Sequence, residues 1–212
     1  MRAQTRRMPT IDLLRPTDVF PTWPRAQHVF ELYAREAPPS AHVLRTTGLL
    51  APDMVERVTE WFLAPGVVNA EVRRSYRALG RESVRLADVV RGCLGVRVAF
   101  SDEEAYLSGG DLCADLREHG TLALVREDPH PLLSTEAFDA LRVVHDVFGH
   151  AALGVGFDLQ SEYAAWLQCR VLFSEAARPA AFCELVGAVT AFVSTGVKPG
   201  LRAKVAPVSW SG

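Results

Sequence analysis

The segment LRVVHDVFGHAALGVGFD, residues 141–158, contains the residue types best suited to hold a metal ion. Two of the six histidines of the chain, His145 and His150, stand here among apolar neighbours. Neutral imidazoles are ligands for zinc, copper, iron and nickel. The segment therefore predicts a metal site on the buried face of a helix, with both histidines as ligands.

The spacing of the two histidines constrains the helix that carries them. At about 100° per residue, five residues place His150 roughly 140° from His145 around an unbroken α-helix. We therefore expect the helix to bend or end between them, at Gly149. Asp146 lies four residues before His150 and shares its helix face, so we expect Asp146 to orient that imidazole or to bind the metal itself.

Two glutamates further along the chain are candidates for a carboxylate ligand. Glu184 is the only charged residue between Arg178 and Lys198, in a helix of apolar or small residues. A buried carboxylate without a partner is costly, so a cation or a metal is expected beside it. Glu162 stands in the first turn of a predicted helix, where an acidic residue is favoured without any metal. We therefore favour Glu184 over Glu162, and both would bind in a dinuclear site.

Two imidazoles and one carboxylate form the donor set of mononuclear iron(II) oxygenases, which keep coordination positions open for oxygen and substrate. With Glu184 as the ligand, Asp146 and Glu162 are the candidates for catalytic carboxylates. The aromatic residues around the site predict an apolar substrate pocket that shields the chemistry from water. These residues are Phe148, Phe157 and Trp166.

The hexapeptide HDVFGH, His145 to His150, resembles the iron-ligand motif of the pterin-dependent aromatic amino acid hydroxylases. The resemblance implies that both histidines bind Fe(II) and that a glutamate on a later helix completes the site, for which Glu184 stands in a broadly similar helix. It also implies dioxygen, a small aromatic amino acid-like substrate and a tetrahydropterin cofactor. The family continues with Val-Pro where this chain has Ala151-Ala152.

Two other functions fit the same residues. The doublet His145-Asp146 resembles that of the HD-type hydrolases, in which metal ions activate water against a phosphoester. His119 or His130 upstream and Asp158 downstream would then supply the further ligands. In the other alternative the chain is a non-catalytic helical binding protein, and its histidines belong to a hydrogen-bonded core.

Composition favours one globular domain over residues 1–212, because 49% of the residues are apolar and 23% are charged. A formal charge of -2 argues against a nucleic-acid partner. No apolar run approaches the roughly 18 residues of a membrane helix. No apolar stretch follows the basic start MRAQTRRMPT, and the four cysteines lack metal-binding spacing, so we expect reduced thiols and a cytoplasmic protein.

The patterning of the chain predicts a mainly α fold with a small β-sheet (α+β) and a metal site between its C-terminal helices. Prolines predict an extended segment over about residues 1–24. The alternating segments GVRVAF and TLALVR are typical of strands. Helices are predicted over residues 25–36, 52–63 and 70–90, and a helical metal-site half over about residues 134–196.

The predicted helix over residues 70–90 carries many arginines on its polar face. We expect an interruption of this helix near Gly80, because glycine weakens a helix interior. The arginines themselves are interpreted as a solvated helix face in preference to an anion-binding surface.

Overall fold

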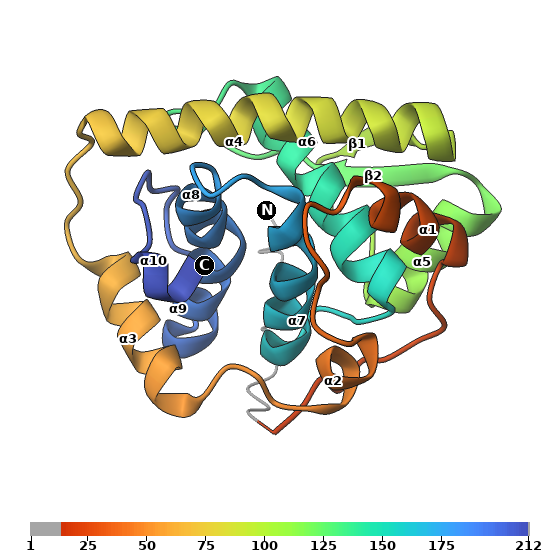
Figure 1. The fold of residues 1–212 in the computed structure, drawn as a ribbon, viewed down its shortest axis with the longest axis horizontal. Helices are drawn as coiled ribbons and strands as arrows, with labels where there is room; N and C mark the ends of the chain where they lie inside the picture. The colour runs from red at the N-terminus through yellow and green to blue at the C-terminus, as the bar shows by residue number, and fades with distance from the viewer. Residues whose placement is uncertain (1–13, 212) are drawn as a thin grey trace.

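We describe residues 14–211 of the chain from a computed structural model, in which helices make up most of the structure (Figure 1). The α-helices of this part of the chain are α1 (Pro24–Tyr33), α2 (Ala41–Thr46), α3 (Pro52–Leu63), α4 (Ala70–Val89), α5 (Gly109–Glu118), α6 (Thr135–Val144), α7 (Leu159–Cys169), α8 (Arg178–Phe182), α9 (Ala188–Thr195) and α10 (Val208–Ser211). The π-helical segments are η1 (Val90–Leu94), η2 (His145–Ala151) and η4 (Cys183–Gly187), and η3 (Arg170–Leu172) is a 3-10 turn. The strands are β1 (Arg97–Ser101) and β2 (Thr121–Val125).

The two strands pair in parallel, with Val98 opposite Leu122 and Phe100 opposite Leu124. Helix α5 makes the crossover that parallel strands require, and Leu122 and Leu124 are buried against the helices. A small two-stranded sheet in a mainly helical fold confirms the predicted fold class in its coarse form.

Helix α4 lies across the other helices as a single straight element (Figure 1). The side chain of Asn69 accepts a hydrogen bond from the N–H of Val72 and caps its N-terminus. The predicted interruption at Gly80 is wrong, because α4 continues as one α-helix from Ala70 to Val89. A Cβ at Gly80 would lie 3.2 Å from Leu133 and 3.4 Å from Ala137. The glycine therefore serves the close packing of α4 on the start of α6 and does not break the helix.

Before α1, the chain runs extended along residues 151–156. The N–H of Phe20 donates to the carbonyl of Gly154, and Val19 forms an antiparallel bridge with Val155. A Cβ at Gly156 would lie 1.9 Å from a carboxylate oxygen of Asp18, so only glycine fits beneath this segment. Residues 1–13 of the predicted extended segment lie outside the described residues.

The main core joins α4, α6, η2 and the C-terminal helices into one apolar cluster. Its largest fully buried side chains include Trp166, Tyr76, Phe148 and Phe182. Within residues 14–211, no helix is both long and apolar enough to cross a membrane.

Candidate metal centre

The two histidines of the HDVFGH motif lie on a π-helix. Helix α6 passes without a break into η2, which begins at His145 and ends at Ala151. Because a π-helix is bonded from residue i to residue i+5, residues five apart lie one above the other. The rings of His145 and His150 accordingly meet edge to face, with centroids 4.5 Å apart and planes at 81°. The predicted bend at Gly149 is wrong, since a change of helix type aligns the imidazoles instead.

Gly149 has a different role, which is to let α7 pack closely on η2. A Cβ at this position would lie 3.0 Å from the Cβ of Ala165 and 3.2 Å from the Sγ of Cys169, both on α7. It would also lie 3.3 Å from the ring of His145. The glycine therefore brings α7 to the distance at which its side chains reach the histidine pair.

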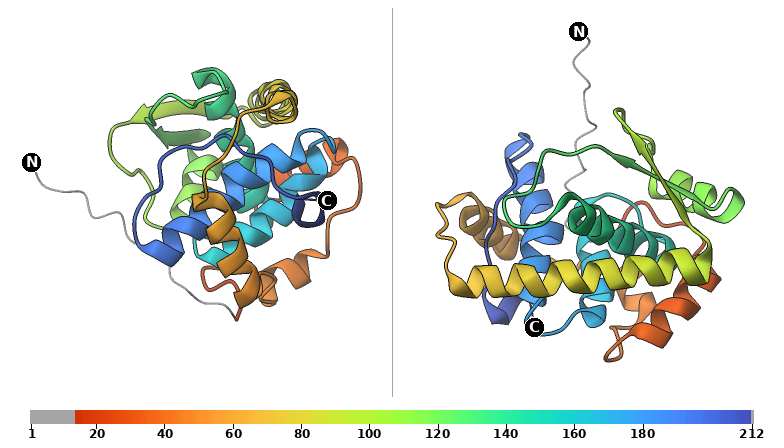
Figure 2. Two further views of the ribbon diagram at one scale, coloured as in Figure 1. Left: turned by 90° about the vertical axis from the view of Figure 1, so that its left-hand side faces the viewer. Right: turned by 90° about the horizontal axis from the view of Figure 1, so that it is seen from above.

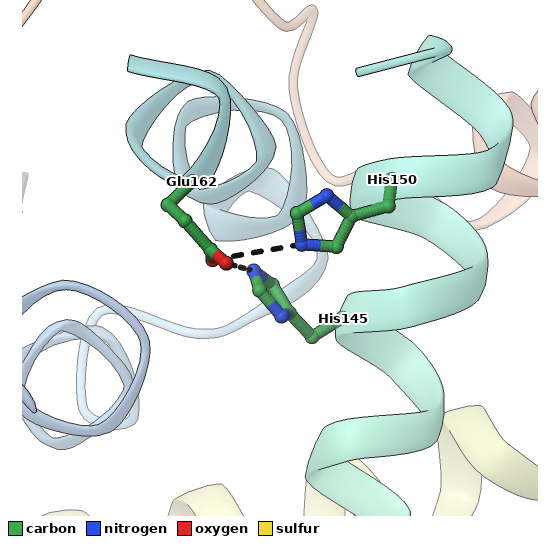
Figure 3. A group of neighbouring side chains, drawn as sticks. All are labelled: His145, His150 and Glu162. Carbon is green, nitrogen blue, oxygen red and sulfur yellow. Dashed lines mark ion pairs between the residues drawn. The ribbon is translucent and has the colours of Figure 1, made fainter. Parts of the chain in front are cut away.

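The carboxylate that meets the histidines comes from α7 and is Glu162 (Figure 3). Asp158 caps this helix by accepting a hydrogen bond from the N–H of Ser161 at 3.0 Å. Glu162 lies in the first turn, and its Oε2 is 3.6 Å from Nε2 of His145 and 3.5 Å from Nε2 of His150. One ligand atom from each of the three residues lies within 4.8 Å of the other two.

The orientation of His150 is set by a backbone carbonyl. Its Nδ1 is 3.1 Å from the carbonyl oxygen of Val155 and must donate the proton, because a carbonyl only accepts. This bond turns Nε2 toward Glu162. Histidines that bind a metal through one ring nitrogen usually donate the N–H of the other to an oxygen in the same way. Gly154, in the left-handed region at φ 76°, makes the turn that brings Val155 back to the ring. Phe157 packs its edge on the same imidazole, with centroids 5.1 Å apart.

His145 supplies the second candidate ligand nitrogen. Its Nε2 is buried and has no hydrogen-bond partner among the described residues. A buried polar atom without a partner is costly, and a metal ion would satisfy it. Metal bonds to imidazole and carboxylate are about 2.1 Å long, so two donors on one ion lie no more than about 4.2 Å apart. The separations of Glu162 from His145 and His150 fall within this limit.

Without a metal, the three groups form an ion pair and a neutral imidazole. Burial and the charge of His150 lower the pKa of His145 to about 3. Burial also acts to lower the pKa of His150, but the carboxylate of Glu162 outweighs it and raises that pKa to about 9. Burial would raise the pKa of Glu162, yet the pairing with His150 lowers it. A metal ion would replace one proton, the one on Nε2 of His150.

The structure places Glu184 elsewhere, which corrects its predicted position beside the histidines. Its Oε1 accepts a short hydrogen bond from the hydroxyl of Tyr76 and lies 3.3 Å from Nε2 of His130. Nδ1 of His130 accepts from the N–H groups of Leu132 and Leu133, so Nε2 carries the donated proton. The isolated carboxylate does have partners, as its burial requires, but they are a phenol and an imidazole.

Asp146 is not the group that orients His150, and this expectation is also corrected. Its Oδ1 lies 3.9 Å from Nδ1 of the adjacent His145, whereas Nδ1 of His150 donates to the carbonyl of Val155. Burial raises the pKa of Asp146 to about 6. Its side chain is 20% exposed, so it lies at the outer side of the histidine pair.

The three aromatic residues predicted to line a pocket have different positions. Phe157 contacts the ring of His150 and is half-buried. Phe148 is fully buried against Phe30, with centroids 6.2 Å apart. Trp166 is fully buried against Phe182, with centroids 5.6 Å apart. Phe157 is thus the one of the three whose ring packs on a candidate ligand.

The further ligands expected for an HD-type hydrolase are engaged away from the histidine pair. His119 is exposed and pairs with Asp115 at 2.9 Å. His130 pairs with Glu184. Asp158 caps α7 and accepts hydrogen bonds from the hydroxyl of Ser161 and from Thr17. The second metal of that mechanism would therefore lack these ligands.

Comparison of the chain with family models, with curated proteins and with solved structures gives no match. The resemblance to the aromatic amino acid hydroxylases therefore rests on the hexapeptide at His145–His150 alone. Glu162 is identified as the candidate carboxylate ligand by its distances from the two histidines.

Proposed function

We propose that this protein is a non-haem iron(II)-dependent oxygenase that acts on a small organic substrate. One observation carries the proposal, the convergence of two imidazole Nε2 atoms and one carboxylate oxygen at His145, His150 and Glu162. Two histidines and one carboxylate are the donor set that leaves positions open on iron(II) for oxygen and substrate.

The chain places the three candidate ligands on two helical elements that pack against each other. His145 and His150 lie on a helix that is continuous with α6, and Glu162 lies in the capped first turn of α7. The hydrogen bond to Val155 holds His150 in the tautomer that leaves Nε2 for the metal. Iron(II), when bound, would supply the activation of oxygen, and the protein residues would position it and limit contact with water.

Two of the three candidate ligands keep part of their side chains exposed to solvent. The side chains of His145 and Glu162 are 10% and 14% exposed, whereas that of His150 is 1% exposed. Phe157 gives the histidine pair an apolar neighbour that suits a hydrocarbon or aromatic substrate. The hexapeptide resemblance supports an aromatic amino acid-like substrate, with tetrahydropterin as the electron donor.

Oxygen consumption tests the proposal. The protein is loaded with iron(II) without oxygen, then mixed with oxygen, tetrahydropterin or ascorbate, and each aromatic amino acid in turn. We expect at least one substrate to speed oxygen uptake and to yield a hydroxylated product by mass spectrometry, and His150→Ala to abolish both. Tight iron binding without substrate-dependent oxygen uptake over a broad panel of small aromatic and aliphatic compounds would contradict an oxygenase.

A further inference from the structure

A row of arginines runs along the outer face of α4. Arg73, Arg77, Arg81 and Arg85, here called the arginine row, follow one another at four-residue spacing and are all exposed. Figure 2, seen from above, shows that α4 lies on the outside of the molecule along its whole length. At a rise of 1.5 Å per residue, the positive charges repeat every ~6 Å along the helix.

The arginine row makes no ion pair with a carboxylate in residues 14–211; its one polar contact is from Nε of Arg77 to the carbonyl of Arg73. Two of the three acidic residues of α4 serve other groups, since Glu82 binds Ser174 and Arg35, and Asp88 binds Arg91. The third, Glu71, forms no ion pair within residues 14–211. Like charges four residues apart destabilise a helix by a few tenths of a kcal/mol per pair, and a bound anion would relieve this repulsion.

Five arginines outside the arginine row do have carboxylate partners in the described part of the chain. The pairs are Arg35–Glu82, Arg91–Asp88, Arg126–Asp102, Arg142–Asp139 and Arg178–Glu36. What distinguishes the arginine row is that four such arginines without a carboxylate partner in residues 14–211 follow one another along one helix.

A hollow of about 430 Å³ opens beside the arginine row, between α4 and the start of α6. Arg77 and Arg81 line it, and its walls include the apolar side chains of Val84, Leu132 and Ala137. Cationic groups beside an apolar hollow suit a ligand that carries both carboxylates and apolar side chains. A nucleic acid fits less well, because the net charge of the chain is -2 and the aromatic residue of the lining, Tyr76, is buried.

We propose that the arginine row and the hollow beside it bind an acidic amphipathic helix of a partner protein. Glutamates four residues apart on such a helix repeat with the same ~6 Å period as the arginine row. Arginine pairs with carboxylates through two parallel hydrogen bonds, and the apolar side chains of the partner would enter the hollow. This interaction surface is independent of the candidate metal centre.

Fluorescence anisotropy with the full chain tests the proposal. The probe is a labelled peptide of repeated Glu-Leu-Ala-Glu units, and its comparison peptides replace every Glu by Gln or every Leu by Ala. We expect the chain to bind the probe, and both comparison peptides to bind about tenfold more weakly. No binding of the probe, or equal binding of the three peptides, would overturn the proposal.

The matched variants are Arg77→Glu with Arg81→Glu, and Arg57→Glu with Arg97→Glu as a control of equal charge change on exposed positions elsewhere. Circular dichroism verifies that each variant is folded. We expect the first pair to weaken probe binding by about tenfold or more and the control pair by less than about threefold. Equal loss in both pairs, or tighter binding of a single-stranded or duplex oligonucleotide than of the probe, would refute the acidic-helix partner.

Discussion

His145 and His150 lie five residues apart, and the π-helix η2 brings their imidazoles together edge to face with centroids 4.5 Å apart. In an α-helix the same spacing would turn the two rings to different faces. A rare helix type thus determines whether the motif can bind one metal, and π-helical turns are frequent at functional sites. We therefore expect the residues that hold η2 in its π-helical form to affect the affinity of the site for a metal ion.

Gly149→Ala should disturb the site without removing a ligand. The added methyl group would lie 3.0 Å from Ala165 and 3.2 Å from Cys169, so α7 must move away from η2. We expect a loss of about 1–3 kcal/mol in the free energy of unfolding. We also expect weaker metal binding, because Glu162 moves with α7. Urea denaturation and metal titration measure the two effects.

Gly92→Ala is the matched control, because Gly92 also lies in a π-helical segment and has no atom within 4 Å of its added Cβ. This substitution should leave metal binding unchanged and raise stability by about 0.4–1 kcal/mol. If both glycine variants behave alike, the close approach of α7 to η2 at Gly149 is not what positions Glu162.

Tyr76→Phe should destabilise the fold and spare the metal centre. Burial and the nearby Glu184 raise the pKa of Tyr76, so its hydroxyl remains a donor to that buried carboxylate. Without this hydroxyl, Glu184 keeps only His130 as a side-chain partner among the described residues, and we expect the free energy of unfolding to fall by about 1–3 kcal/mol.

Tyr33→Phe is the control. The half-buried Tyr33 forms no hydrogen bond through its hydroxyl among the described residues, so this substitution should lower the free energy of unfolding by less than about 0.5 kcal/mol. Denaturation curves compare the stabilities of the two variants. Loss of metal from the Tyr76→Phe variant would indicate that Glu184 belongs to the metal site.

Metal binding should release about one proton at neutral pH. The pKa of His150 is raised to about 9, so its imidazole is charged in the metal-free protein and must lose a proton to bind a metal. Glu162, with a lowered pKa, is already ionised, and His145 is already neutral. Apparent affinity should therefore rise about tenfold from pH 6 to pH 7 and stop rising near pH 9.

Calorimetric titration in buffers of different ionisation enthalpy counts the released proton. Val155→Ala serves as a control, because it keeps the carbonyl that accepts from Nδ1 of His150 and should keep the same proton count. A proton count near zero would contradict the ion pair between His150 and Glu162.

Local sequence patterns were sufficient for most of the helices. The prediction for residues 52–63 coincides with α3, whose first residue is Pro52 and whose apolar residues share one face. The two strands were also predicted, within two residues of their ends. Their parallel pairing depends on α5, which the alternation of apolar residues does not encode.

The metal site could be predicted only in part. The types and environment of His145 and His150 indicated the site, but apolar spacing does not distinguish an α-helix from a π-helix. The sequence alone favours Glu184 over Glu162, because an acidic residue in the first turn of a helix needs no metal to explain it. The useful signal was Asp158, whose capping role places Glu162 at the start of α7, close after the turn at Gly154.

Glu184 has the polar partner that its burial predicts, but this partner is not a metal site formed with His145 and His150. A buried carboxylate does need a polar neighbour, but Tyr76 lies on α4, far away in the sequence. No local pattern relates these two residues, because only the packing of α4 on the C-terminal helices brings them together.

The most direct test measures iron retained by the wild-type chain and by two isosteric variants, Glu162→Gln and Glu184→Gln. Each protein is loaded with iron(II) without oxygen, passed through a desalting column and analysed for metal, with circular dichroism as the check of folding. We predict about one iron per chain for the wild type and for Glu184→Gln, and little or none for Glu162→Gln. Iron retained by Glu162→Gln and lost by Glu184→Gln would contradict a metal centre formed by His145, His150 and Glu162.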